Sequence, residues 1–204
     1  MEIAMDNPRL PEFDENSPLR PARFGHLVLR TPQFNKMAPW YKTFLNAEPL
    51  FDAPFASFLT YDDEHHRVLV VSDPNAKPKD TSAAGVAHFA YLYDCLTDLM
   101  SAYARLRDLG VEPTYCVNHG FQFSLYYHDP DKNEVEIGCD NFGTRQELND
   151  WFAEGHFAKN VYGYDFDPEA IYRQHKAGVT DEQIFAGTYG GKLPDMSKAF
   201  EPKA

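Results

Sequence analysis

Two histidines stand at matching positions in two similar stretches of the chain. His26 lies in the run FGHLV and His88 in the run VAHFA, and both runs alternate as a β-strand does. A single strand histidine is usually structural, but two at corresponding positions can converge if the halves pack around a pseudo-twofold axis. Glu134 and Glu136, on one face of a later strand, could add a carboxylate. Two neutral imidazoles and one carboxylate, with the other coordination positions open, suit Fe(II) in oxygenases.

The elements that must position these groups occur twice in the same order. A strand, a helix and three strands are predicted first over residues 24–31, 34–46, 49–53, 55–63 and 66–73. A linker rich in Pro, Lys, Asp and Ala follows at 74–84. The same order then repeats over residues 85–93, 95–110, 113–117, 121–129 and 134–140. The chain therefore contains two modules of the type strand, helix and three strands.

The last strand of the first module offers no partner to the carboxylates of the second. Its sequence, RVLVVS at 67–72, contains neither a carboxylate nor a glutamine. A symmetric site with four protein ligands would need one of these at this position. The sequence therefore favours three protein ligands and an open coordination face. Spacing alone does not choose between Glu134 and Glu136, because both point to the same face of the strand.

Composition and charge exclude several classes of function. Of the 204 residues, 43% are hydrophobic and 25% charged, which is typical of a soluble globular protein, and the 15% of aromatic residues indicates either an aromatic-lined cavity or a Phe-rich core. The net charge of -12 disfavours nucleic acid and anionic membranes as partners. No apolar run reaches the roughly 18 residues of a membrane-spanning helix. We therefore expect a protein that binds neither nucleic acid nor membrane.

The cysteines and the N-terminal sequence predict a cytoplasmic location. The three cysteines, Cys95, Cys116 and Cys139, are odd in number and form no CxxC pair, which indicates a reducing compartment. Residues 1–21 are acidic and Pro-rich, without the apolar core of a signal peptide, and are expected to form an extended arm.

The arrangement of these elements resembles the vicinal oxygen chelate superfamily, also called the glyoxalase/bleomycin resistance/dioxygenase superfamily. Within it, the chain resembles the single-domain type I extradiol ring-cleavage dioxygenases over residues 22–142. The resemblance implies an α+β fold in which two βαβββ modules, at about 22–73 and 85–142, form a curved mixed sheet around a metal site. A helical C-terminal extension would follow at 143–204.

Two motifs carry this resemblance. The first joins His119, the pair Leu125 and Tyr126, the pair Asp129 and Pro130, and Glu136 at the spacing of the dioxygenases. It departs from their pattern at one turn position, residue 132, where a lysine replaces the usual Gly or Pro.

The second motif is the sequence DDEHHRVLVV at 62–71, which resembles the His-His run of the same enzymes. The second histidine of that run, here His66, is the acid–base residue in the family. Alternation along a strand predicts that His65 points to the other face.

The resemblance also distributes roles among the candidate residues. His26, His88 and Glu136 would bind Fe(II), with Mn(II) as the alternative. His66, His119 and Tyr126 would be catalytic and would contact the substrates. Three further residues could line an apolar pocket or equally belong to the core, namely Phe121, Phe123 and Phe142. The substrates would be O2 and a catechol-type aromatic diol, including biaryl or polycyclic diols.

Two other functions remain open on the same scaffold. A metal-dependent lyase or isomerase, similar to glyoxalases and epimerases, would need a fourth protein ligand in the strand at 67–72. A metal-free protein that binds small molecules would leave the coincidence of His26, His88 and Glu136 without a reason. Bound metal separates the second alternative from the enzymes.

The C-terminal extension is predicted to contain two helices, at 144–155 and 165–178. Thr144 and Glu147 form a capping-box pattern at the start of the first helix. Packing against the sheet or a neighbouring subunit is favoured over a lid that supplies Trp151 or Phe152. Because two modules leave surfaces that larger family members cover, we expect a homo-oligomer.

Overall fold

The computed structural model describes residues 18, 20–80 and 82–189. Almost all of the predicted N-terminal arm at 1–21 lies outside the described residues, as does the end of the C-terminal extension at 190–204. Within the part that is described, no helix combines the length and the apolar character needed to cross a membrane.

The first module forms the predicted strand, helix and three strands. Its elements are β1 (Leu27–Thr31), α1 (Phe34–Leu45), β2 (Glu48–Ala53), β3 (Ala56–Thr60) and β4 (Val68–Ser72). The strands form one sheet in the order β1-β4-β3-β2, with β1 at its edge and parallel to β4. Met37, Tyr41 and Phe44 recur at helical spacing on α1, so they share one buried face of this helix.

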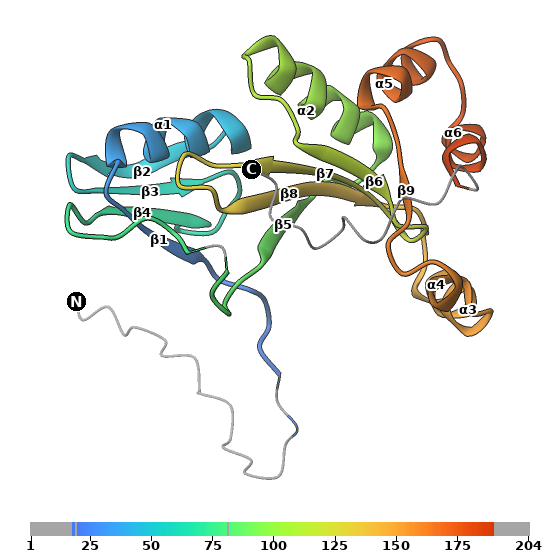
Figure 1. The fold of residues 1–204 in the computed structure, drawn as a ribbon, viewed down its shortest axis with the longest axis horizontal. Helices are drawn as coiled ribbons and strands as arrows, with labels where there is room; N and C mark the ends of the chain where they lie inside the picture. Colours follow the sequence, from blue (N-terminus) through green and yellow to red (C-terminus); the bar gives the residue numbers. More distant parts are fainter. Residues whose placement is uncertain (1–17, 19, 81, 190–204) are drawn as a thin grey trace, which may run out of the picture.

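The second module repeats this arrangement. Its elements are β5 (His88–Leu92), α2 (Leu96–Asp108), β6 (Tyr115–Asn118), β7 (Gln122–His128) and β8 (Glu134–Asp140). The sheet runs in the order β5-β8-β7-β6-β9, with β5 at its edge and parallel to β8, and with β9 (Tyr164–Asp165) supplied by the C-terminal extension. The helices α1 and α2 lie on the same side of the two sheets (Figure 1).

The predicted α+β fold with two βαβββ modules is confirmed. The modules differ from the expectation in one respect, because their strands form two separate sheets rather than one continuous curved sheet. In the described residues, the first strand of each module has only one hydrogen-bonded neighbour, so β1 and β5 both end their sheets. Side chains, rather than a strand pair, therefore connect the modules.

A buried carboxylate makes the central connection. Asp129, in the turn between β7 and β8, accepts hydrogen bonds from the backbone N–H of Asp131 (2.9 Å), the backbone N–H of Asn133 (2.8 Å) and the hydroxyl of Tyr41 on α1 (2.9 Å). Burial raises the pKa of Asp129 above its usual value, although the hydrogen bonds from Asn133 and Tyr41 act in the opposite direction. The turn of one module is thereby fixed to the helix of the other.

Two further side chains strengthen this contact. Gln33, just before α1, donates through Nε2 to the carbonyl of Pro130 and to Asp131, both at 2.7 Å. Arg105 of α2 donates to the carbonyls of Thr43 and Phe44 at 2.6 and 2.9 Å. These carbonyls belong to the last turn of α1, where cations interact favourably with the helix dipole.

The turn between β7 and β8 also contains the departure from the family pattern. Lys132 adopts a φ of 66°, in the left-handed region where glycine is favoured. The lysine therefore occupies a backbone conformation that the usual glycine would adopt at lower cost.

Up to residue 189, where the described part ends, the C-terminal extension adds four helices and one short strand. The helices are α3 (Arg145–Ala153), α4 (His156–Lys159), α5 (Pro168–Lys176) and α6 (Asp181–Thr188). The predicted helices correspond to α3 and α5, and the predicted capping box of Thr144 and Glu147 is present. β9 was not predicted, because two residues carry no periodicity, and neither was the second capping box, at Thr180 and Gln183 before α6.

The connection between Tyr41 and Asp129 predicts a pH-dependent loss of stability in Tyr41→Phe. The substitution leaves a buried carboxylate one donor short, so we expect a loss of about 1–3 kcal/mol at pH 7. The pKa of Asp129 is raised in the folded protein. Its contribution to the free energy of unfolding therefore falls as the pH rises from the usual aspartate pKa through this raised pKa. The loss should therefore be smaller below this pH range, where the carboxyl is protonated. Urea unfolding at the two pH values measures the difference.

Tyr127→Phe is a matched control for this substitution. Tyr127 is also fully buried, but its hydroxyl has no hydrogen-bond partner among the described residues. Removing that hydroxyl should leave the free energy of unfolding nearly unchanged or raise it. Equal losses in the two variants would show that the hydrogen bond to Asp129 contributes nothing.

Candidate active site

Glu136 and His88 lie in contact on one face of the second sheet. The Nε2 atom of His88 is 3.1 Å from Oε2 of Glu136, and the strand register pairs Ala90, two residues after His88, with Glu136. Glu136 is only 4% exposed. A carboxylate buried to this degree needs compensating partners. The structure therefore brings two of the three predicted metal ligands together.

Gln122 is the second partner of this carboxylate. Its Nε2 donates to Oε1 of Glu136 at 2.9 Å from the neighbouring strand β7. Gly138 makes room for the glutamine side chain, because a Cβ at this position would lie 2.5 Å from Nε2 of Gln122. The donated hydrogen bond orients the carboxylate, so that its other oxygen faces His88.

His119 and Tyr126 form a hydrogen-bonded pair on the same sheet. The Nε2 atom of His119 lies 3.0 Å from the hydroxyl of Tyr126, and its Nδ1 atom lies 2.5 Å from the backbone carbonyl of Tyr162. A carbonyl only accepts, so the Nδ1 atom carries a proton. Burial lowers the pKa of His119, which favours the neutral ring. Nε2 is then an acceptor, and the hydroxyl of Tyr126 donates to it.

The pair lies beside the carboxylate. Tyr126 is directly opposite Glu136 in the pairing of β7 with β8, and its ring makes an edge contact with His88 at 5.5 Å between centroids. Burial, followed by the charge of Glu136, raises the pKa of Tyr126, so the phenol stays protonated at neutral pH. The second module thus presents an imidazole, a carboxylate, a phenol and a neutral histidine on one surface.

The C-terminal extension contributes to this arrangement through the segment before β9. A Cβ at Gly163 would lie 2.4 Å from the carbonyl oxygen of Asn118, so only glycine allows this close approach to β6. The approach places the carbonyl of Tyr162 on His119. Trp151 of α3 packs against Phe121, and a Cβ at Gly120 would lie 2.4 Å from its ring.

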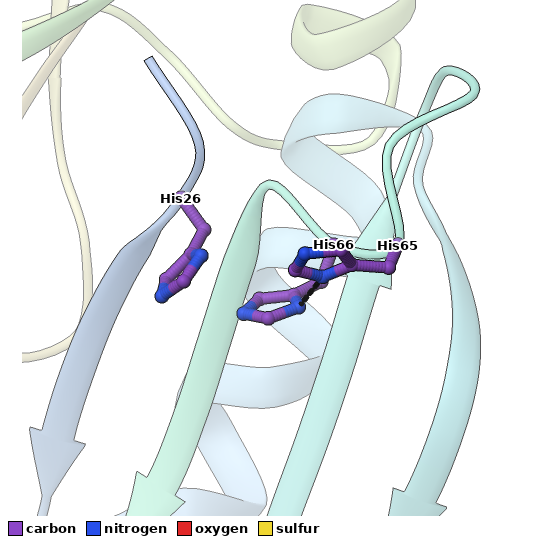
Figure 2. A group of neighbouring side chains, drawn as sticks. All are labelled: His26, His65 and His66. Carbon is purple, nitrogen blue, oxygen red and sulfur yellow. Dashed lines mark hydrogen bonds between the residues drawn. The ribbon is translucent and has the colours of Figure 1, made fainter. Parts of the chain in front are cut away.

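A second cluster of histidines lies in the first module (Figure 2). His26, His65 and His66 each offer a ring nitrogen, and these three atoms lie within 4.8 Å of one another. The ring centroids of His26 and His66 are 4.1 Å apart. His66 is 6% exposed, whereas His26 and His65 are exposed. A nitrogen cluster of this kind could hold a divalent metal ion.

The expected orientation of His65 was wrong. His65 and His66 lie in the loop before β4 rather than in a strand, so alternation does not apply to them. Their side chains approach each other instead, with 2.6 Å between the two Nδ1 atoms.

The predicted catalytic and metal-binding residues therefore lie in two groups. His88, His119, Tyr126 and Glu136 gather on the second sheet, while His26 and His66 gather at the end of the first. Within the described residues, the ring nitrogens of the cluster with His65 and His66 are the only three ligand atoms that all lie within 4.8 Å of one another. The ring nitrogen of His26 is therefore not within 4.8 Å of ligand atoms of both His88 and Glu136.

The three predicted pocket phenylalanines have different surroundings. Phe123 lies in the hydrophobic core, the alternative that the sequence left open for it. Phe121 lies next to the site, with its ring stacked on His119 at 5.8 Å. Phe142 lines a depression of about 380 Å³ at the far ends of β5 and β8, together with Leu92 and Asp140.

Strand register identifies the counterparts of the second-module residues in the first module. Ala90 pairs with Glu136, and Val28, the matching residue of β1, pairs with Leu69. The position that corresponds to Glu136 is therefore apolar. Of the two candidate carboxylates, Glu136 is buried and hydrogen-bonded, whereas Glu134 is half-buried and 3.7 Å from Nδ1 of His88.

Sequence reasoning missed three contributors to the site. Gln122 and Gly138 share the face of Glu136 by strand alternation, and that signal could have identified them. The carbonyl of Tyr162 has no side-chain signature, so no pattern could reveal it.

Comparison with known proteins places this arrangement in a family. Residues 23–137 match the Glyoxalase/Bleomycin resistance protein/Dioxygenase superfamily. Biphenyl-2,3-diol 1,2-dioxygenase 3 of Rhodococcus globerulus is 40% identical over 177 residues, which cover 86% of this chain and 93% of the relative. Biphenyl-2,3-diol 1,2-dioxygenase 2 of the same organism is 39% identical over 163 residues, covering 79% and 86%.

Solved structures show the same fold at low identity. A glyoxalase/dioxygenase from Nostoc punctiforme has a TM-score of 0.52 and 18% identity, covering 63% of this chain and all of that one. A glyoxylase/bleomycin resistance protein/dioxygenase domain from Frankia sp. EAN1pec has a TM-score of 0.51 and 18% identity, covering 63% and 99%. The chain belongs to the glyoxalase/bleomycin resistance protein/dioxygenase superfamily, as its two modules predicted.

Proposed function

We propose that this protein is an extradiol ring-cleaving dioxygenase that acts on a biaryl diol and O2. The observation that carries the proposal is the identity of about 40% over most of the chain to two biphenyl-2,3-diol 1,2-dioxygenases. In those names the hydroxyl groups are on carbons 2 and 3, and the bond that breaks joins carbons 1 and 2. The broken bond is thus adjacent to the diol rather than within it, which defines extradiol cleavage.

His26, His88 and Glu136 are the proposed metal ligands. Two imidazole nitrogens and one carboxylate oxygen suit Fe(II), with Mn(II) as the alternative. The contact of 3.1 Å between His88 and Glu136 supports the proposal, as does the location of the two histidines at the starts of the edge strands, with His26 directly before β1 and His88 the first residue of β5. When bound there, a metal ion of this type would supply a Lewis-acidic, redox-active centre for the diol and O2.

His66 is the proposed acid–base residue. Its Nε2 atom is buried and has no hydrogen-bond partner among the described residues, so it is available to a ligand. Burial, with His26 and His65 nearby, lowers the pKa of His66, which favours the neutral ring that can accept a proton from a diol hydroxyl. The protonated ring can later return that proton to an oxygen of the opening ring.

His119 and Tyr126 are the proposed groups that stabilise developing charge on the reacting oxygens. The carbonyl of Tyr162 fixes the ring of His119, and His119 in turn holds the hydroxyl of Tyr126. Tyr126 has a single hydroxyl proton, so it can donate to a reacting oxygen only when its hydroxyl rotates away from Nε2 of His119. A donor held next to the site needs only this small rearrangement when negative charge appears. The apolar ring of Phe121 beside them matches an aromatic substrate.

The lyase or isomerase alternative is less consistent with the structure. It calls for a fourth protein ligand in the first module, and the corresponding position is Leu69. The metal-free binding protein gives no reason for a buried carboxylate that contacts His88. The assembly into a homo-oligomer and the cytoplasmic location stay predictions.

Oxygen uptake tests the proposed function directly. Protein reconstituted anaerobically with Fe(II), and separately with Mn(II), is mixed with biphenyl-2,3-diol and with simple catechols while the visible spectrum is recorded. We expect consumption of one O2 per diol and a yellow ring-opened product, fastest with the biaryl diol. Bound metal without uptake would favour non-redox chemistry, and failure to retain any metal would favour the binding protein.

The metal ligands can be tested by single substitutions. His88→Ala should lose the metal, and so should His26→Ala, as metal analysis would show. His88 is the decisive position because His26 also belongs to the cluster with His65 and His66. Full metal content in His88→Ala would show that the metal binds at that histidine cluster and not at His88.

His66→Phe should keep metal and substrate binding but lower kcat by about 10²–10⁴-fold. Phenylalanine approximates the ring volume and removes both nitrogen atoms. Substrate binding measured under anaerobic conditions separates this effect from loss of affinity. Normal turnover would exclude the acid–base role.

Gln122→Leu should lower metal affinity by about 10–100-fold, because Glu136 loses the hydrogen bond that orients it. Metal titration of the variant measures this change. Gln174→Leu, at an exposed position of α5, is the matched control and should bind metal as the unsubstituted protein does. Unchanged metal affinity in Gln122→Leu would show that this hydrogen bond does not support a metal ligand.

A further inference from the structure

The Nε2 atom of His66 is a buried polar atom without a hydrogen-bond partner in the described part of the chain. A buried N–H without an acceptor is rarer in proteins than an incompletely satisfied acceptor. We therefore assign Nε2 of His66 as the unprotonated nitrogen of the ring, which carries a lone pair. That assignment requires the proton of the neutral ring to be on Nδ1, and something must hold it there.

The surroundings of His66 supply an acceptor at Nδ1. The Nδ1 atom of His65 lies 2.6 Å from the Nδ1 atom of His66, a distance that requires a proton between them. His26 and Phe58 contact the same ring, with centroids at 4.1 and 4.9 Å. They fix its plane, but neither of them forms a hydrogen bond with the ring nitrogens of His66 in the described part of the chain.

The position of Glu64 decides which histidine donates. Its Oε1 atom lies 3.3 Å from Nε2 of His65, and its Oε2 atom accepts from Arg23 at 2.7 Å. The guanidinium of Arg23 lowers the pKa of Glu64, so the carboxylate stays ionised and acts only as an acceptor. A proton on Nε2 of His65 is thereby favoured, and a neutral His65 then has a lone pair on Nδ1.

We propose that His65 is a positioning residue for His66, holding its Nδ1 proton through a chain from Glu64 to His65 to His66, so that Nε2 of His66 presents its lone pair to the substrate. The inference rests on the proposed function only in the use made of that lone pair. The protonation pattern itself is a property of the first module alone. In this arrangement His65 contacts neither substrate nor metal, and its effect on the reaction passes through His66.

Two substitutions of His65 separate positioning from bulk. Asn places its side-chain oxygen near the position of the histidine Nδ1 atom, so His65→Asn keeps an acceptor for His66. His65→Leu fills a similar volume and offers none. His65 is exposed, so neither change should disturb folding, and circular dichroism spectra verify this.

Nitrogen-15 NMR of the histidine rings gives a test that does not depend on activity. Spectra are recorded on the full chain, without metal and with diamagnetic Zn(II). We expect His66 to carry its proton on Nδ1 in the unsubstituted protein and in His65→Asn, and on Nε2 in His65→Leu. A proton on Nε2 of His66 in the unsubstituted protein, or the same tautomer in all three proteins, would overturn the proposal.

Kinetics with biphenyl-2,3-diol then show whether the orientation matters. His65→Leu should lower kcat by about 10–100-fold with KM and metal content unchanged, and His65→Asn should recover most of the loss. Loss of metal from both variants would make His65 a ligand in the cluster with His26 and would also overturn the proposal. If the unsubstituted protein turns over no diol, the proposed function fails, while the NMR result still decides the role of His65.

Discussion

The burial of one carboxylate governs the arrangement of the second module. Glu136 lies in the middle of β8 with 4% of its surface exposed, and an ionised group in such a position is costly unless it is paired. His88 and Gln122 provide the pairing from the two adjacent strands, and Gly138 provides the space for Gln122. The carboxylate therefore determines residue types at three neighbouring positions, none of which would be required by a sheet that served only as a core.

The first module shows what the same fold looks like without this requirement. Its register places Leu69 where the second module has Glu136, and Phe58 where the second module has Tyr126. Apolar residues satisfy that sheet because no charge has to be compensated. The histidines of the first module lie instead at the sheet's end, before β1 and in the loop before β4. The duplicated fold thus supports an unequal distribution of polar groups, with the histidine cluster of His26, His65 and His66 in one module and the buried carboxylate of Glu136 in the other.

Sequence periodicity predicted the modules because their helices and strands are long enough to show a period. The predicted helix at 34–46 became α1, and the predicted helix at 95–110 became α2. The separation into two sheets was not predictable, because the groups that join the modules, Asp129, Tyr41 and Arg105, are polar residues whose partners are distant in sequence. The predicted orientation of His65 was wrong because this residue lies in the loop before β4, where the alternation of a strand does not hold. The family spacing identified Glu136, and its burial relative to Glu134 agrees with that choice.

The C-terminal extension is connected to the site as well as to the core. Packing was expected, and Trp151 on Phe121 shows it. The segment before β9 does more, because the Tyr162 carbonyl determines which nitrogen of His119 carries a proton, and thereby the direction in which Tyr126 donates. This contact depends on Gly163, whose missing side chain lets the segment approach β6. A backbone group far from the motif in sequence thus sets the hydrogen-bonding direction of two residues within it, so the functional unit extends past the two modules to β9.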